Sequence, residues 1–360
     1  MRLFTDDAAG RLDNIEGLYK HLTNPPSTAP SMPTIGEYLA MARVERDAFN
    51  RRRLDHLSSD FTIATHDLKD VSSQMRLTAL RNRTRTIGRG GVMLSGYSAM
   101  GKTTAALTAM REVFAQYIAE NPNWSEQNRL PVVYVEVPPT SSGKAMMGRF
   151  LEFLGVDGIK NWTLEQRTQA VVQILNKAGT RFVVVDEFHN LVAKSAGSQE
   201  TANVLKGLSN SVPATFVYSG INIHRSDVLA GATGQQIASR FSPVLLESYS
   251  MATADDKKRW RGLIRAFERE MCLFNHPEGT LNSLSAYLYN RTQGAIGSLS
   301  RLLVSSAQLI ILEGSGTETE TITEERLASI PLDLRAQNAE REQPSVAPSA
   351  PRRKVKANAA

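Results

Sequence analysis

A glycine-rich stretch at residues 96–103 has residue types at a spacing that can bind a triphosphate. It reads GYSAMGKT and fits G-x-x-x-x-G-K-[ST], in which glycines let successive backbone N–H groups point into one concavity. Lys102 is expected to reach the β- and γ-phosphates, and the Thr103 hydroxyl to hold Mg²⁺. The other residues expected to contact the nucleotide are Gly96, Tyr97, Ser98, Ala99, Met100, Gly101 and Thr104.

Two adjacent carboxylates form the second part of the predicted site. Asp186 and Glu187 end the apolar, β-branched run 182–185, which predicts a buried parallel strand. Such a strand delivers both acids to the carboxyl edge of an open α/β sheet, where ligands bind. Asp186 is expected to orient Mg²⁺ together with Thr103, and Glu187 to act as the general base toward the attacking water. These residues predict binding of ATP with Mg²⁺ and its hydrolysis to ADP and phosphate.

The elements around these residues alternate in type, as they do in a parallel α/β sheet. Apolar runs predict strands at 92–94, 130–137, 182–186, 213–220 and 244–246. Helix-forming runs lie between them at 103–118, 144–154 and 164–178. Strand signals end near residue 253, and three helical runs follow. We therefore expect an α/β P-loop NTPase core with a parallel sheet, followed by an α-helical C-terminal lid.

The same signals predict how the chain divides. We expect a helical or irregular N-terminal extension at 1–60, an ATPase core at 61–250, a lid at 251–332 and a disordered basic tail at 333–360. Within the extension, a proline-rich connector at 24–33 precedes a helical run at 34–57. The apolar residues expected on one face of that run are Leu39, Met41, Val44 and Phe49.

Composition restricts the class of protein. The chain has 360 residues, of which 41% are hydrophobic and 22% charged, and no apolar run approaches the ~20 residues of a membrane span. The first ten residues lack the apolar centre of a signal peptide, so we expect a cytoplasmic protein with no membrane partner. The single cysteine, Cys272, excludes an internal disulfide and is expected to be a buried apolar residue.

Positive charge leaves a nucleic-acid role open. The net charge is +6, and five arginines without an acid lie between residues 76 and 89. This cluster fits a phosphate backbone, and it equally fits a solvated face or pairing with acids elsewhere. The end of the tail, 352–356, is also basic, and it fits either contact with nucleic acid or a solubilising role.

Four stretches together resemble the AAA+ ATPases of DNA transposition, of TniB and TnsC type, which are related in role to the MuB targeting protein. The stretches are GYSAMGKTT at 96–104, LPVVYVEVPPTSSGKAMMGRFLEFLG at 130–155, FVVVDEFHNL at 182–191 and TQGAIGSLSRLL at 292–303. The resemblance implies an ATP-dependent protein that assembles as a ring or filament on duplex DNA and recruits or activates a separate transposase. The chain shows no acid triad of a DDE recombinase, so strand transfer would belong to that partner.

The resemblance also assigns roles to residues outside the two main motifs. In AAA+ ATPases a polar residue after the strand at 213–220, called sensor 1, contacts the γ-phosphate or the attacking water; Asn222 and Ser219 are the candidates, and a plain turn is the alternative. Arg240 lies where the family places an arginine finger, and an ordinary surface arginine is the alternative. Arg301 is the candidate for the sensor 2 arginine of the lid, and His189 is either structural or catalytic.

Two other functions remain compatible with the residues. One is a different AAA+ machine on DNA, such as an initiator-like loader or a plasmid or phage maintenance factor. The other is a scaffold whose interactions are switched by nucleotide binding, with turnover incidental. Hydrolysis stimulated by DNA would separate both ATPases from the scaffold.

Overall fold

A parallel five-stranded sheet lies at the centre of the chain. A computed structural model describes residues 11–59, 61–191, 195–314 and 316–331. The strands are β1 (Gly91–Gly96), β2 (Val132–Glu136), β3 (Phe182–Asp186), β4 (Thr215–Gly220) and β5 (Phe241–Leu246). Their order is β2-β3-β4-β1-β5, and every neighbouring pair is parallel. Because the strands are parallel, all their carboxyl ends meet at one edge of the sheet, and this edge receives the residues of both predicted motifs.

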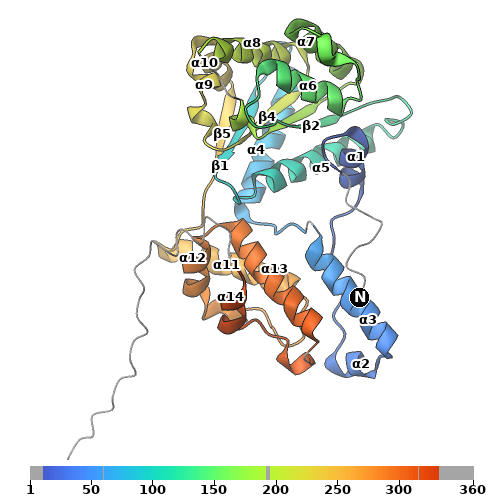
Figure 1. The fold of residues 1–360 in the computed structure, drawn as a ribbon, viewed down its shortest axis with the longest axis vertical. Coiled ribbons are helices and arrows are strands. Elements are labelled where there is room, and N and C mark those ends of the chain that lie inside the picture. The colour runs from blue at the N-terminus through green and yellow to red at the C-terminus, as the bar shows by residue number, and fades with distance from the viewer. Residues whose placement is uncertain (1–10, 60, 192–194, 315, 332–360) are drawn as a thin grey trace, which may run out of the picture.

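Helices cover both faces of this sheet (Figure 1). One group packs together around α5 and comprises α1 (Ile15–Thr23), α4 (His66–Asn82) and α5 (Lys102–Glu120). The other group comprises α6 (Gly143–Phe153), α7 (Leu164–Lys177), α8 (Ser195–Ser211), α9 (Asp227–Ala230) and α10 (Ala232–Ala238). With helices on both faces the central strands are buried throughout, which explains the unbroken apolar run of β3.

A second apolar cluster lies among the C-terminal helices, below the sheet in Figure 1. These helices are α11 (Ala254–Glu270), α12 (Ser285–Thr292), α13 (Ile296–Glu313) and α14 (Glu324–Ser329). Among the described residues, α13 is the one helix whose length and composition would let it cross a membrane. Its residues Leu299, Leu302 and Leu303 are buried in this second cluster, as in the core helix of a folded domain.

The residues before 60 contribute to both apolar clusters. Leu18 and Leu22 of α1 pack in the first cluster, and the Tyr19 hydroxyl donates a hydrogen bond to the carbonyl of Val132 at 2.9 Å. The helix α3 (Arg43–Ser58) instead joins the second cluster through Leu54 and its neighbour Leu57.

A buried ion pair attaches α3 to the C-terminal helices. Arg53 is fully buried, pairs with Glu320, and donates to the carbonyl of Cys272 at 2.7 Å. Its guanidinium lies over the rings of Phe49 and Phe274. Cys272 is buried, which confirms the prediction for it.

The helical run predicted at 34–57 is divided in the structure. The chain forms two helices, α2 (Ile35–Ala40) and α3, because Met41 and Ala42 are extended and Glu45 caps the second helix at the backbone N–H of Ala42. The predicted common face is therefore lost: Leu39 is 57% exposed and Val44 79% exposed, whereas Phe49 is buried. The predicted tail at 333–360 lies outside the described residues.

Candidate nucleotide site

The loop between β1 and α5 is bent by residues in the left-handed backbone region. Ala99 has φ of 63° and Gly101 φ of 80°. A Cβ atom at Gly96 would lie 2.5 Å from the carbonyl oxygen of Leu246, so glycine is required where β1 and β5 end together. The helix α5 begins at Lys102, and its N-terminus brings N–H groups and positive potential to the loop. The loop therefore has the shape and the polarity of an anion site.

Lys102 is held over this loop as a largely buried cation. Its Nζ donates to the carbonyl of Tyr97 at 2.7 Å, and the residue is 7% exposed. Burial lowers the pKa of the Lys102 ammonium group, and the carboxylates of Glu187 and Asp186 oppose that shift. A phosphate at the loop would relieve the cost of this buried charge.

Asp186 connects the two sequence motifs. The residue is 1% exposed, and its Oδ2 accepts hydrogen bonds from the Thr103 hydroxyl at 2.8 Å and the Tyr134 hydroxyl at 3.0 Å. Its Oδ1 accepts from the backbone N–H of Glu187 at 2.9 Å. These three hydrogen bonds fix the orientation of the Asp186 carboxylate at the end of β3.

The donor set suits Mg²⁺. This ion prefers hard oxygen ligands and takes few of them from the protein, with water and substrate phosphates completing its shell. Thr103 and Asp186 provide two such oxygens side by side. Within the described ranges no group of three or more His, Cys, Asp or Glu side chains is arranged to hold a metal ion. Thr103 and Asp186 would hold Mg²⁺ together with the nucleotide, where the ion neutralises charge on the phosphates.

Glu187 lies beside Asp186 in an unusual backbone conformation, with φ of 53°. Its Oε2 is 3.2 Å from Nδ1 of His189. The backbone N–H of Ile221, just after β4, donates to the same Nδ1 at 3.3 Å. One nitrogen cannot accept from Ile221 and donate to Glu187 at the same time, so these contacts are alternatives set by the histidine tautomer. His189 thus connects the predicted base to the loop after β4.

The two sensor 1 candidates differ in access. Ser219 is fully buried, and its hydroxyl has no hydrogen-bond partner among the described residues. Asn222 is partly exposed, has φ of 47°, and precedes the 3₁₀ turn Ile223–Arg225. Both lie at the carboxyl end of β4, next to β3. Of the two, Asn222 is the one whose side chain is partly exposed.

Arg240 lies at the opposite edge of the sheet from the loop of its own chain. Its carbonyl accepts from Gly91 at the start of β1, whereas the phosphate loop follows the end of that six-residue strand, about 20 Å away. The side chain is exposed and donates to the amide oxygen of Asn210 at 3.0 Å. At this distance Arg240 can serve a nucleotide only in another subunit.

The C-terminal helices contact the phosphate loop directly. The backbone N–H of Gly297, at the start of α13, donates to the carbonyl of Ala99 at 2.9 Å. A Cβ at Gly297 would lie 2.8 Å from the Cβ of Ala99, so glycine is required for this approach. Arg301 is exposed and lies about one helical turn beyond Gly297. It does not line the cavity that the phosphate loop and the C-terminal helices enclose.

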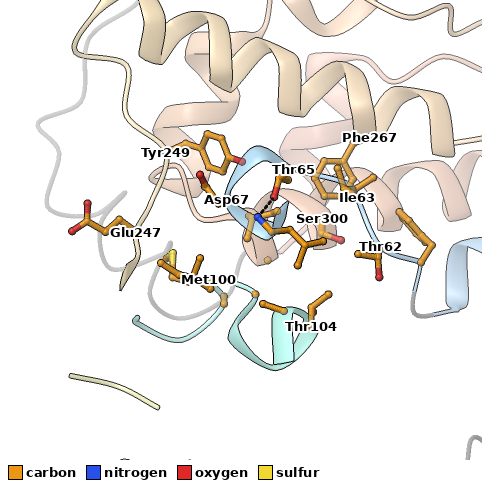
Figure 2. A pocket seen from close by; sticks show the side chains of 18 residues that line it. Thr62, Ile63, Thr65, Asp67, Met100, Thr104, Glu247, Tyr249, Phe267 and Ser300 are labelled. Atoms are coloured by element: carbon orange, nitrogen blue, oxygen red, sulfur yellow. Dashed lines mark hydrogen bonds between the residues drawn. The ribbon is translucent and has the colours of Figure 1, made fainter. Parts of the chain in front are cut away.

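A cavity of about 280 Å³ lies where the loop, β5 and the C-terminal helices meet. Figure 2 shows Met100 and Thr104 on one side of it, with Ile63 and Phe267 among the side chains opposite. Tyr249 also lines the cavity, and burial raises the pKa of its phenol to about 12. The cavity is mostly apolar and adjoins the phosphate loop, as the pocket for a nucleobase would.

Sequence reasoning missed Tyr134 and Gly297. Tyr134 falls in the run 130–137, which the sequence presents as an ordinary buried strand. The period of two along β2 could have placed its side chain on the same face as that of Glu136, but not identified Asp186 as its partner. Gly297 carries no side chain whose chemistry could signal a role.

Replacing Tyr134 with phenylalanine should remove the hydrogen bond that positions Asp186 while preserving the packing of the ring. We expect the Mg²⁺ concentration for half-maximal ATP hydrolysis to rise about tenfold, because groups that orient a metal ligand typically contribute 10–100-fold. Tyr218→Phe is the matched control, since that buried phenol has no hydrogen-bond partner among the described residues. Identical Mg²⁺ titrations for the two variants would rule out the positioning role.

Comparison with known proteins decides the family. The family model of the bacterial TniB protein matches residues 53–251. The chain belongs to the TniB family. The resemblance found in the sequence is thereby confirmed. No curated protein matches the chain.

Two Aeropyrum pernix proteins are among the solved structures similar to this TniB-family chain. The Aeropyrum pernix ORC1 protein, in complex with DNA, has a TM-score of 0.54 and 16% identity, covering 78% of this chain and 68% of that one. The Aeropyrum pernix ORC2 protein in its ADP form has a TM-score of 0.53 and 14% identity, covering 81% and 72%. At these identities the likeness concerns the fold, and it confirms the predicted AAA+ P-loop class.

Proposed function

We propose that this chain is an ATPase that assembles on duplex DNA and recruits or regulates a separate transposase. In this proposal residues 61–250 act as the ATPase core and 251–332 as its lid. Lys102 binds the phosphates, Thr103 and Asp186 hold Mg²⁺, and Glu187 is the general base for the attacking water.

The observation that carries the proposal is the hydrogen bond between Thr103 and Asp186, 2.8 Å long. It joins a phosphate loop to an acidic strand end across 83 residues, so one nucleotide can contact both. Glu187 directly follows Asp186 in the chain, and the neighbouring strand β4 ends at the same edge of the sheet. The TniB family supports the transposition role, and the DNA bound to the similar ORC1 protein supports DNA association.

The proposal is tested by ATP hydrolysis with and without duplex DNA, with particle size followed in the same samples. We expect DNA to stimulate hydrolysis and ATP to increase particle size on DNA. Turnover unaffected by DNA, with particles of constant size, would instead favour a nucleotide-switched scaffold. An initiator-like loader would show the same stimulation by DNA, and would differ by failing to bind a transposase.

Replacing Arg240 with alanine should reduce hydrolysis about a thousandfold in assembled protein, because a finger arginine stabilises transition-state charge. A subunit with Arg240→Ala retains its own nucleotide site, and a subunit with Lys102→Ala retains the arginine that would act on its neighbour's nucleotide. Mixing the two inactive variants should therefore restore part of the activity. Arg181→Ala, an exposed arginine at the start of β3, is the control and should be fully active. Mixed assemblies that stay inactive would contradict action between subunits.

A further inference from the structure

The outer face of α11 carries a continuous row of cations. The row comprises Lys257, Lys258, Arg261, Arg265 and Arg269, all exposed. At 3.6 residues per turn they fall within an arc of about 120° along the helix. The opposite face of α11 is buried through Trp260, Leu263, Ile264 and Phe267, so the row is held pointing outward. We call this row the α11 cationic face.

The acidic residues of α11 lie off this face or point inward. Asp255 and Asp256 are in the first turn, where carboxylates favour the helix N-terminus. Glu268 is buried and accepts from the backbone N–H groups of Gly279 and Leu281. The cations of the face have one acidic contact among the described residues, Arg269 with Glu278 at 3.6 Å. Solvated helix faces usually interleave both signs, and this face does not.

A glycine lies beside this face, at a position where no packing contact requires it. Gly262 lies inside the helix, next to Arg261 and one turn from Lys258 and Arg265. A Cβ atom there would meet nothing within 4 Å. Glycine inside an exposed helix is less favourable than alanine. Its presence is accounted for if an external partner approaches the backbone closely at the edge of the cationic face.

We propose that the α11 cationic face binds the phosphate backbone of duplex DNA. The inference rests on the DNA association proposed above and names its surface. The face is about 18 Å long from Lys257 to Arg269. Phe267, on the inner side of the same helix, lines the cavity next to the phosphate loop. One helix therefore contacts the DNA outside and the nucleotide pocket inside.

The test compares two full-length variants that each lose four positive charges. The first changes Lys257, Lys258, Arg261 and Arg265 to glutamine. The control changes Arg43, Arg46, Arg51 and Arg52 of α3, where Glu45, Asp47 and Asp55 interleave the cations. Binding to a fluorescent 30-base-pair duplex is measured from about 50 to 200 mM salt with MgATP present.

We expect the α11 variant to lose at least tenfold in affinity at about 100 mM salt, and its salt slope to flatten by about three. The control should change little, and ATP hydrolysis without DNA should be the same in both. An equal loss in the two variants would mean a net-charge effect and overturn the proposal. Wild-type affinity in the α11 variant would also overturn it, and Arg81, Arg83 and Arg85 would then be the next phosphate contacts to remove.

Replacing Gly262 with alanine distinguishes an effect on DNA binding from an effect on the stability of the fold. We expect this variant to melt at a higher temperature than the wild type and yet bind the duplex several-fold more weakly. Unchanged DNA affinity in the stabilised variant would contradict a close approach at Gly262. If the wild type itself bound no duplex in any nucleotide state, the proposed DNA association would fail. If the wild type bound it and the α11 variant bound equally, this inference alone would fail.

Discussion

Replacing Lys102 with alanine should abolish tight binding of ATP. The Lys102 ammonium group is buried over the phosphate loop and donates to the carbonyl of Tyr97, so a phosphate is the ligand that would stabilise its charge. Losing a buried, charge-assisted contact costs about 3 kcal/mol or more, which is at least a hundredfold in affinity. Binding is measured by titrating a fluorescent ATP analogue in the presence of Mg²⁺.

The same substitution should leave the fold intact. Burial already lowers the pKa of Lys102, which means that the folded chain disfavours this charge when no anion is bound. The melting temperature without nucleotide should therefore stay the same or rise, while the stabilisation by added ATP should disappear. Lys177→Ala, at the exposed end of α7, should melt and bind ATP as the wild type does. Wild-type ATP affinity in Lys102→Ala would overturn the assignment of the phosphate loop.

The features that could be predicted from the sequence are those set by local pattern. The phosphate loop needs fixed glycine spacing, and the apolar run before Asp186 and Glu187 needs a strand buried on both faces. Both signals are short and continuous in the chain. For that reason the sheet, its carboxyl edge and the Thr103–Asp186 pairing could be anticipated from the residues alone.

Features that depend on distant contacts could not be predicted. In the sequence, Arg53 is one of three consecutive arginines at 51–53. In the structure it is buried, because it forms an ion pair with Glu320, 267 residues further along the chain. Gly297 matters through its contact with Ala99, which no local pattern encodes. The strand β5 begins at Phe241 rather than Val244, because pairing with β1 extends it past the serine and proline that interrupt the apolar run.

Replacing Glu187 with glutamine should give a protein that binds ATP but hydrolyses it 10²–10⁴-fold more slowly, roughly the usual contribution of a general base. Glutamine keeps the shape of the side chain and can still hydrogen-bond His189, so the φ of 53° and the neighbouring Asp186 contacts should persist. Because ATP remains bound, DNA-bound assemblies should persist longer than those of the wild type. Hydrolysis is measured as phosphate release, and assembly by particle size on DNA.

Glu136 provides the decisive control for that experiment, because it is another carboxylate at this edge of the sheet. It pairs in register with Asp186 across β2 and β3. Burial raises the pKa of Glu136, and the charges of Asp186 and Glu187 add to the shift. A carboxyl group with a raised pKa at the reacting edge could itself take a proton. We expect Glu136→Gln to hydrolyse ATP within a few-fold of the wild type, because Glu187 lies next to His189 and the loop after β4. If Glu136→Gln were the inactive variant and Glu187→Gln the active one, the base would be Glu136.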